Sequence, residues 1–127
     1  MTTEQFSQKY NGRIIRDDGA YMSREAKSFF RDMTAALKKS FAKFNITIVK
    51  TTVSHYDCCW FCERNGKLAY ISYSIRRGLP LNLQEGNCFQ GFLCRSVRDL
   101  HDYTGGTNHF SNLTSLPGLT DMVISQS

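Results

Sequence analysis

Residues 56–75 read YDCCWFCERNGKLAYISYSI, in which two runs of aromatic and apolar residues flank the pair Asn65-Gly66. Asn-Gly is the preferred pair for a two-residue type I′ turn, so the two runs are predicted to form an antiparallel hairpin. Side chains alternate between the two faces of a strand, and this register gathers apolar residues on one face and leaves the other mixed and mostly polar. The facing apolar pairs are Cys62 with Ala69, Trp60 with Ile71, Cys58 with Tyr73, and Tyr56 with Ile75.

An amphipathic helix is predicted upstream of the hairpin, over residues 23–44. Ser23 can cap its first turn, and Glu25 complements the positive end of the helix dipole. At about 100° per residue, the apolar side chains of this segment form one stripe and a set of basic side chains forms a neighbouring stripe. The apolar stripe is Ala26, Phe30, Met33, Leu37, Phe41 and Phe44, and the basic stripe is Arg24, Lys27, Arg31 and Lys38.

The remaining segments predict shorter elements. Runs of β-branched and apolar residues indicate strands, clusters of Gly and Asn indicate turns, and a proline can begin a helix. The predicted elements are strands at 46–55 and 92–97, a short strand at 13–15, a long loop at 77–91, a turn-rich segment at 98–112, and a short helix from Pro117 to Ile124.

The length of 127 residues suits a single domain. Residues 1–21 lack periodicity and are expected to be a loosely ordered lead-in. The whole chain is therefore predicted to be one α+β domain, in which one long amphipathic helix packs on an antiparallel sheet of about four strands.

The charge of the chain is uneven. Lys and Arg number 16 against 11 Asp and Glu, a net charge of +5. Residues 1–44 carry nine basic and five acidic side chains, a net +4, whereas residues 45–127 carry seven and six, a net +1. We therefore expect an acidic partner to bind to the lead-in and the helix. The N-terminus does not read as a secretory signal, and no stretch approaches the roughly 20 apolar residues of a membrane-spanning helix, so we expect a cytoplasmic protein with no membrane partner.

Five cysteines are present, an odd number that argues against a fully paired disulfide framework. The candidate ligands of a zinc ion are His55, Cys58, Cys59 and Cys62, because zinc takes four N or S ligands. Cys59 and Cys62 are three residues apart on a continuous strand, so they point to opposite faces and cannot bind one ion together. We therefore expect no metal and no cofactor. A small zinc-binding protein is the alternative if a turn breaks this strand.

A catalytic role would rest on His55, Asp57 and Cys59, which line one side of the same strand. A cysteine, a histidine and an orienting carboxylate are the parts of a nucleophile site. Residues two apart on a strand are separated by about 6.6 Å at the backbone, which is too far for close contact. The sequence also contains no G-x-S-x-G, H-E-x-x-H or P-loop motif. We expect a protein that is not an enzyme, with a polar strand facing solvent at these positions.

Basic and aromatic residues together suggest a nucleic-acid interface. The basic helix stripe could contact phosphates, together with Arg76, Arg77, Arg95 and Arg98. Phe61 and Tyr70 oppose each other on the outer face of the predicted sheet and could stack on bases, as aromatic platforms do on RNA-binding sheets. The alternative is that these lysines and arginines lie on the surface only to keep the helix soluble.

Five short motifs follow one another along the chain: His55-Tyr56-Asp57, Asn65-Gly66-Lys67, YISYS at 70–74, LCRS at 93–96, and DYTGGTNHF at 102–110. With the preceding helix they cover roughly residues 22–113. Together they resemble small proteins encoded by phages and conjugative elements of Gram-positive gut bacteria. In that group the strand after His-Tyr-Asp usually lacks a cysteine cluster, so the cluster is a departure of this chain.

Small proteins of mobile elements often inhibit host defences, and the resemblance implies an anti-CRISPR-like inhibitor. Such a protein would act without chemistry, by binding a host defence effector such as a Cas nuclease, or its nucleic acid, in the cytoplasm of the host bacterium. A basic DNA- or RNA-binding accessory protein is the alternative. The segment Asp102–Phe110 is either an interaction surface or a tight loop in which Gly105 and Gly106 supply positive φ.

Overall fold

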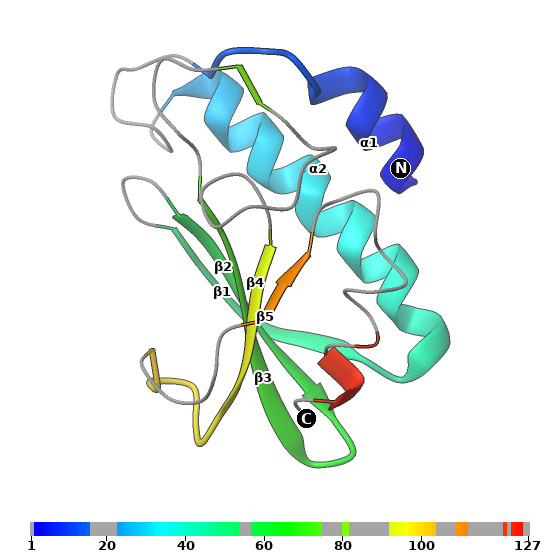
Figure 1. Cartoon of the computed structure of the whole chain (residues 1–127), viewed down its shortest axis with the longest axis vertical. Coiled ribbons are helices and arrows are strands. Elements are labelled where there is room, and N and C mark those ends of the chain that lie inside the picture. Colours follow the sequence, from blue (N-terminus) through cyan, green and yellow to red (C-terminus); the bar gives the residue numbers. More distant parts are fainter. Residues whose placement is uncertain are drawn as a thin grey trace.

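The computed structural model describes residues 2–15, 23–53, 57–74, 80–81, 92–103, 109–111, 121 and 123–125. The strands form one antiparallel sheet in the order β1-β2-β3-β4-β5, so neighbours in the sequence are neighbours in the sheet. Helix α2 lies across one face of the sheet and α1 lies beside α2 (Figure 1). The predicted α+β class is confirmed, and the described residues form five strands where about four were predicted. The elements are α1 (Thr3–Tyr10), α2 (Arg24–Phe41), a 3-10 turn (Ala42–Phe44), β1 (Thr47–Val53), β2 (Asp57–Arg64), β3 (Lys67–Ser74), β4 (Phe92–Val97) and β5 (His109–Ser111).

The central hairpin, β2 and β3, forms in the predicted register. Asn65 and Gly66 have φ values of 53° and 78°, the left-handed conformation that a type I′ turn requires at both central positions. The predicted pair Tyr56 and Ile75 lies outside the described residues. The pairs confirmed are Cys62 with Ala69, Trp60 with Ile71, and Cys58 with Tyr73.

Helix α2 begins where predicted and ends three residues earlier. Ser23 caps it by accepting a hydrogen bond from the Ala26 amide at 3.0 Å. Asn45, with φ 61°, ends the 3-10 turn that follows. The predicted apolar stripe is wrong at Phe44, which is 47% exposed, whereas Phe30 is half-buried and packs against the main core. The buried residues of α2 are Ala26, Phe29, Met33, Ala36, Leu37 and Phe41.

Trp60 of β2 joins α2 to the sheet. Its ring stacks on that of Phe30 with centroids 5.5 Å apart. Its indole N–H donates to Thr34 Oγ1 at 2.9 Å, and the Thr34 hydroxyl donates in turn to the Phe30 carbonyl at 2.8 Å. The buried indole is therefore satisfied, and its polar atom fixes the position of α2 along the sheet.

The N-terminal lead-in is a helix, contrary to the prediction of a loose segment. Thr2 and Gln5 form a capping box at the start of α1. The rings of Phe6 and Tyr10 pack on Phe29 of α2, with centroids 5.4 and 5.2 Å away. An eight-residue helix is marginal alone, so this packing is what stabilises it. The strand predicted at 13–15 is also wrong: the segment is not a strand.

The residues that follow α1 are tied to a distant part of the chain. The Gly12 amide donates to the Leu81 carbonyl at 2.8 Å, and the Leu81 amide donates to the Arg13 carbonyl at 2.7 Å. Leu81 and Ile15 are both buried in the main core. These two backbone hydrogen bonds fix the turn after α1, so that Arg13 reaches α2.

The outer face of the sheet, opposite α2, is not a polar solvent-facing surface. Cys59, Phe61 and Tyr70 are 6%, 0% and 6% exposed. They form a second apolar cluster with Val97 and Leu100, because the chain turns over this face after β4. The predicted solvent exposure of this face is therefore wrong at these three positions, and a segment distant in sequence is the cause.

The end of the chain adds two elements. Strand β5 pairs with β4, within a segment predicted to be turn-rich. Asp121 and Val123–Ser125 are helical, in agreement with the short predicted helix, and residues 117–120 lie outside the described part of the chain. Val123 is buried in the main core. Among the described helices, none has the length and apolar character required to cross a membrane.

Candidate nucleic-acid interface

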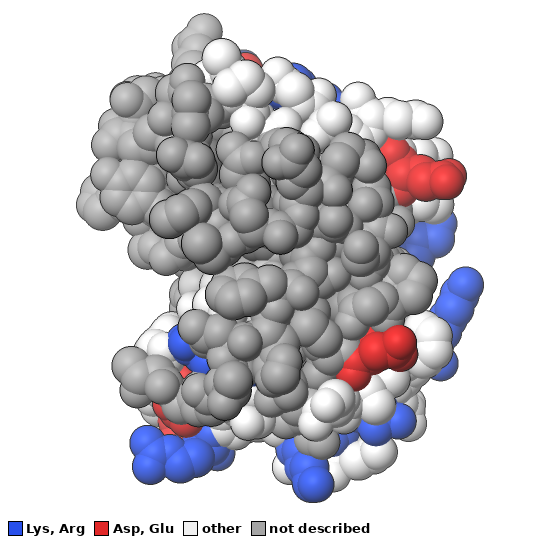
Figure 2. Space-filling view, in the orientation of Figure 1, with Lys and Arg blue, Asp and Glu red and all other residues white. Residues whose placement is uncertain are grey.

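The exposed crest of α2 carries a row of cations. Arg24, Lys27, Arg31 and Lys38 are all exposed, as the basic stripe predicts, and we call them the basic ridge. Arg24 and Lys38 are fourteen helical steps apart, which at 1.5 Å per residue is about 21 Å, the length of about six base pairs of duplex. Figure 2 shows Lys and Arg side chains projecting from the right-hand and lower rims of the face in view.

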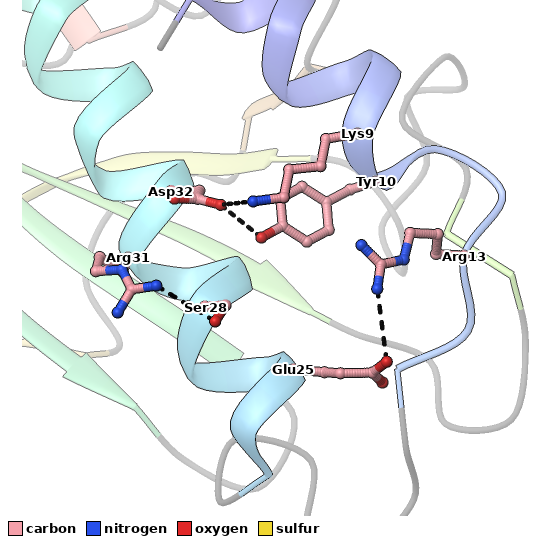
Figure 3. A network of polar contacts seen from close by, with 7 residues as sticks. All are labelled: Lys9, Tyr10, Arg13, Glu25, Ser28, Arg31 and Asp32. Atoms are coloured by element: carbon pink, nitrogen blue, oxygen red, sulfur yellow. Dashed lines mark hydrogen bonds and ion pairs between the residues drawn. The ribbon is translucent and has the colours of Figure 1, made fainter.

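The two acidic residues of α2, Glu25 and Asp32, lie on its flank and are paired with residues from α1 and the turn after it (Figure 3). Arg13 approaches Glu25 Oε1 at 3.5 Å. Lys9 Nζ and the Tyr10 hydroxyl both donate to Asp32 Oδ2, at 2.9 and 2.6 Å. Within the described residues, the ion pairs of both carboxylates are on the flank, and no ion pair involves a residue of the basic ridge.

Asp32 is held ionised by its neighbours. Burial would raise the pKa of its carboxyl, but the hydrogen bonds from Tyr10 and Lys9, with the charges of Lys9 and Arg31, lower it below the usual value of 3.8. The same contact raises the pKa of Lys9. For Tyr10, burial and then the hydrogen bond to Asp32 raise the pKa. The three groups therefore form a fixed polar clamp between α1 and α2.

Asp32→Asn is expected to lower the free energy of unfolding by about 1–2 kcal/mol at neutral pH, since a neutral amide accepts weaker hydrogen bonds than a carboxylate. The pKa of Asp32 is lower in the folded than in the unfolded chain, so its stabilising contribution is present above the unfolded value and is lost as the pH falls through the folded value. Urea melts at neutral and acid pH should show the difference closing below 3.8. An unchanged difference would contradict the clamp.

A small pocket lies at the junction of α1, the turn after it and the first turns of α2. Its volume is about 210 Å³, which is the share of about seven water molecules. Arg24 belongs both to the pocket and to the basic ridge, so the two are continuous. The described residues that line the pocket are Lys9, Tyr10, Arg13, Arg24, Glu25 and Ser28.

The predicted aromatic platform is not available to a ligand. Phe61 and Tyr70 do face each other, with ring centroids 5.1 Å apart, but both are buried. Tyr103 covers them, its ring 5.4 Å from Phe61 and 5.9 Å from Tyr70. The prediction that bases stack on this pair is therefore wrong, because both rings are buried. Arg76 and Arg77, two of the other predicted contacts, lie outside the described residues.

Two cations hold Tyr103 over this cluster. Lys50 of β1 donates to the Leu100 carbonyl at 2.7 Å and lies 5.3 Å from the centre of the Phe61 ring. Arg95 of β4 donates to the Tyr103 carbonyl and lies 4.5 Å from the centre of the Tyr70 ring. The Tyr70 hydroxyl contacts Cys59 Sγ at 3.0 Å. The first residues of the segment Asp102–Phe110 thus have a structural role here, and residues 104–108 lie outside the described part.

The cysteines are separated as the register predicts. Cys58 and Cys62 lie in the core beneath α2, and Cys59 lies in the cluster on the opposite face. These three thiols therefore cannot ligate one ion, and His55 lies outside the described residues. No group of three or more His, Cys, Asp or Glu in the described part could hold a metal ion. Burial raises the pKa of Cys94 to about 12 and also raises that of Cys62, so both are neutral thiols at neutral pH.

Lys9 and Arg13 are parts of this interface that the sequence analysis missed. Both come from the segment predicted to be loosely ordered. The signal that could have placed them is local: Thr2 and Gln5 have capping-box spacing, and Phe6 and Tyr10 are four residues apart on one helical face.

The fold and the surface define an α+β protein with a five-stranded antiparallel sheet, one long covering helix and a basic ridge on the exposed side of that helix. Comparison of the chain with protein-family models, with curated proteins and with solved structures found no match. We therefore infer a function from the charges and contacts of this surface.

Proposed function

We propose that the chain binds nucleic acid through the basic ridge of α2, without catalysis, and that it serves as an anti-CRISPR-like inhibitor that occupies the nucleic acid of a host defence effector. The observation that carries the proposal is the segregation of charge on α2. Both carboxylates are turned to the flank and paired, whereas the four ridge cations face solvent. A helix that only needed solubility would gain more from mixed charges on its exposed face.

The geometry of the ridge suits a phosphate backbone. Its cations lie on one side of a rigid helix and are spread along about 21 Å, so a strand can follow them without wrapping the molecule. Arginine presents a planar fork that matches phosphate oxygens, and lysine adds a point charge. Such contacts fix position and supply affinity without reading sequence. Binding is therefore expected to be independent of sequence and sensitive to salt.

The double variant R24Q/K27Q tests this proposal. Four phosphate contacts predict a slope of about −2.8 for log K against log salt on a single strand, and the loss of two contacts should reduce its magnitude by about 1.4. Fluorescence anisotropy with a labelled oligonucleotide, titrated between about 50 and 200 mM salt, measures both values.

The matched control is K43Q/K67Q, which removes the same charge from two exposed lysines outside the ridge. Its slope should stay near that of the wild type. Equal slopes for the two double variants would mean that only net charge acts, and the ridge proposal would fail. The same two double variants test the inhibitory role. In a defence-nuclease cleavage assay, the wild type and K43Q/K67Q should block cleavage, whereas R24Q/K27Q should not.

A basic accessory protein that binds DNA or RNA is the second candidate, and it uses the same ridge. The cleavage assay separates the two. An accessory protein would show the salt-dependent binding described above, and would leave the defence nuclease active.

A further inference from the structure

The pocket between α1 and α2 carries an excess of positive charge next to the basic ridge. Lys9, Arg13 and Arg24 supply three positive charges. Glu25 within the pocket and Asp32 beside it supply two negative charges, so the described residues of the site carry one positive charge in excess. One phosphodiester group carries one negative charge, so it balances this site, whereas a terminal phosphate with about 1.5–2 charges would exceed it.

Neither arginine of the pocket is held by a strong ion pair within the described residues, and the Arg13 guanidinium lies over the Tyr10 ring, 5.4 Å from its centre. Arg24 forms no ion pair with another described residue. Arg13 meets Glu25 through a single contact of 3.5 Å between half-exposed side chains, longer than a well-formed hydrogen bond. Exposed pairs of this kind contribute little, so a phosphate that receives two parallel hydrogen bonds from a guanidinium can displace it.

Glu25 also presents an unused acceptor. Its Oε2 atom is shielded from solvent and receives no hydrogen bond, whereas buried carboxylate oxygens are normally paired. The last torsion of a glutamate side chain is soft, so rotation of the carboxylate can turn either oxygen toward the pocket. A ligand with a hydrogen-bond donor could therefore bind this Glu25 oxygen. Glu25 lines the same pocket as Arg13 and Arg24, the two arginines that would hold the phosphate.

We propose that this pocket holds one ribonucleotide unit of an RNA strand, with the phosphodiester on Arg13 and Arg24 and the ribose 2′-hydroxyl donating to Glu25. The inference rests on the proposed function and narrows it from nucleic acid to RNA. The 2′-hydroxyl is the group by which a protein distinguishes RNA from DNA at a single site. Along the ridge, binding would remain insensitive to base sequence.

Anisotropy titrations with three labelled strands of one base test the proposal: oligo(rU), oligo(dU) and 2′-O-methyl oligo(U). A hydrogen bond to a carboxylate predicts that oligo(rU) binds about tenfold more tightly than the other two. In Glu25→Gln the preference should fall toward one. The matched control, Glu4→Gln, removes the same charge from the first turn of α1 and should keep the preference.

Circular dichroism checks that both variants keep the helix content of the wild type. Equal affinity of the wild type for oligo(rU) and oligo(dU), or a preference that survives Glu25→Gln, overturns the RNA inference and leaves binding by the ridge intact. Failure of the wild type to bind any of the three strands overturns both this inference and the proposed function.

Discussion

Phe29→Ala should lower the free energy of unfolding by about 3–5 kcal/mol, a large part of the roughly 5–15 kcal/mol that stabilises a domain. Phe29 is fully buried at the point where three layers meet. Its ring lies 5.4 Å from Phe6 and 5.2 Å from Tyr10 of α1, and 5.8 Å from Tyr73 of the sheet. Truncation removes the ring contacts to α1 and to the sheet and leaves a cavity between them, so both the transfer and the cavity terms apply.

The loss should also release α1. That helix is too short to persist without the Phe29 contact, so the polar clamp at Asp32 would weaken together with the core. Urea unfolding followed by the fluorescence of the single tryptophan, Trp60, gives the free energy. Phe44→Ala is the control: Phe44 is 47% exposed and its truncation should change stability by about 0.5 kcal/mol or less. Equal midpoints for the two variants would contradict the role given to Phe29.

The contrast between Phe29 and Phe30 shows what helix periodicity can and cannot predict. A single stripe includes Phe30 and omits Phe29, whereas the structure buries Phe29 fully and leaves Phe30 half-buried at the edge of the core, against Trp60. The cause at Phe29 is α1, whose Phe6 and Tyr10 rings pack on that flank of α2 and widen its buried face. A stripe calculated from one segment cannot include a second helix that the sequence pattern leaves unassigned.

The hairpin was predictable because its rules are local. Asn65-Gly66 defines the turn, the turn defines the register, and the register defines which face each side chain occupies. The separation of Cys59 from Cys58 and Cys62 follows from the same rule. The cover on the outer face was not predictable in this way, since it depends on residues 98–103 returning over strands more than twenty-five positions earlier.

The basic ridge follows from a local sequence rule, whereas the pocket depends on contacts between distant segments. The ridge lies on one helix and follows from helical spacing alone. The pocket requires α1, the turn after it, and the two backbone hydrogen bonds to Leu81 that fix Arg13. Pairing between segments about seventy residues apart carries no local sequence signal, so the part of the interface that would read the sugar could only be found in the structure.

Phe61→Ala is expected to lower the free energy of unfolding by about 3–5 kcal/mol and to leave the salt slope of oligonucleotide binding unchanged. Phe61 is completely buried, between Tyr70 and Tyr103 and beneath the ammonium of Lys50. Its removal takes one of the three rings from the outer cluster and leaves Lys50 without its cation–π contact. The ridge is on α2, which packs on the opposite face of the sheet (Figure 1), so effects at the two sites should be independent.

An exposed stacking platform would give the opposite pattern. Phe61→Ala would then cost about 1–3 kcal/mol in binding for each base stacked and little in stability. Urea unfolding and anisotropy on the same preparation separate the two cases. If Phe61→Ala does not fold, Tyr103→Ala is the variant to measure in its place. Tyr103 is 42% exposed, and its truncation uncovers the Phe61 and Tyr70 rings without removing either. Tighter oligonucleotide binding by Tyr103→Ala would mean that the rings form a covered base-stacking surface, and unchanged binding would assign them to the core of the outer face alone.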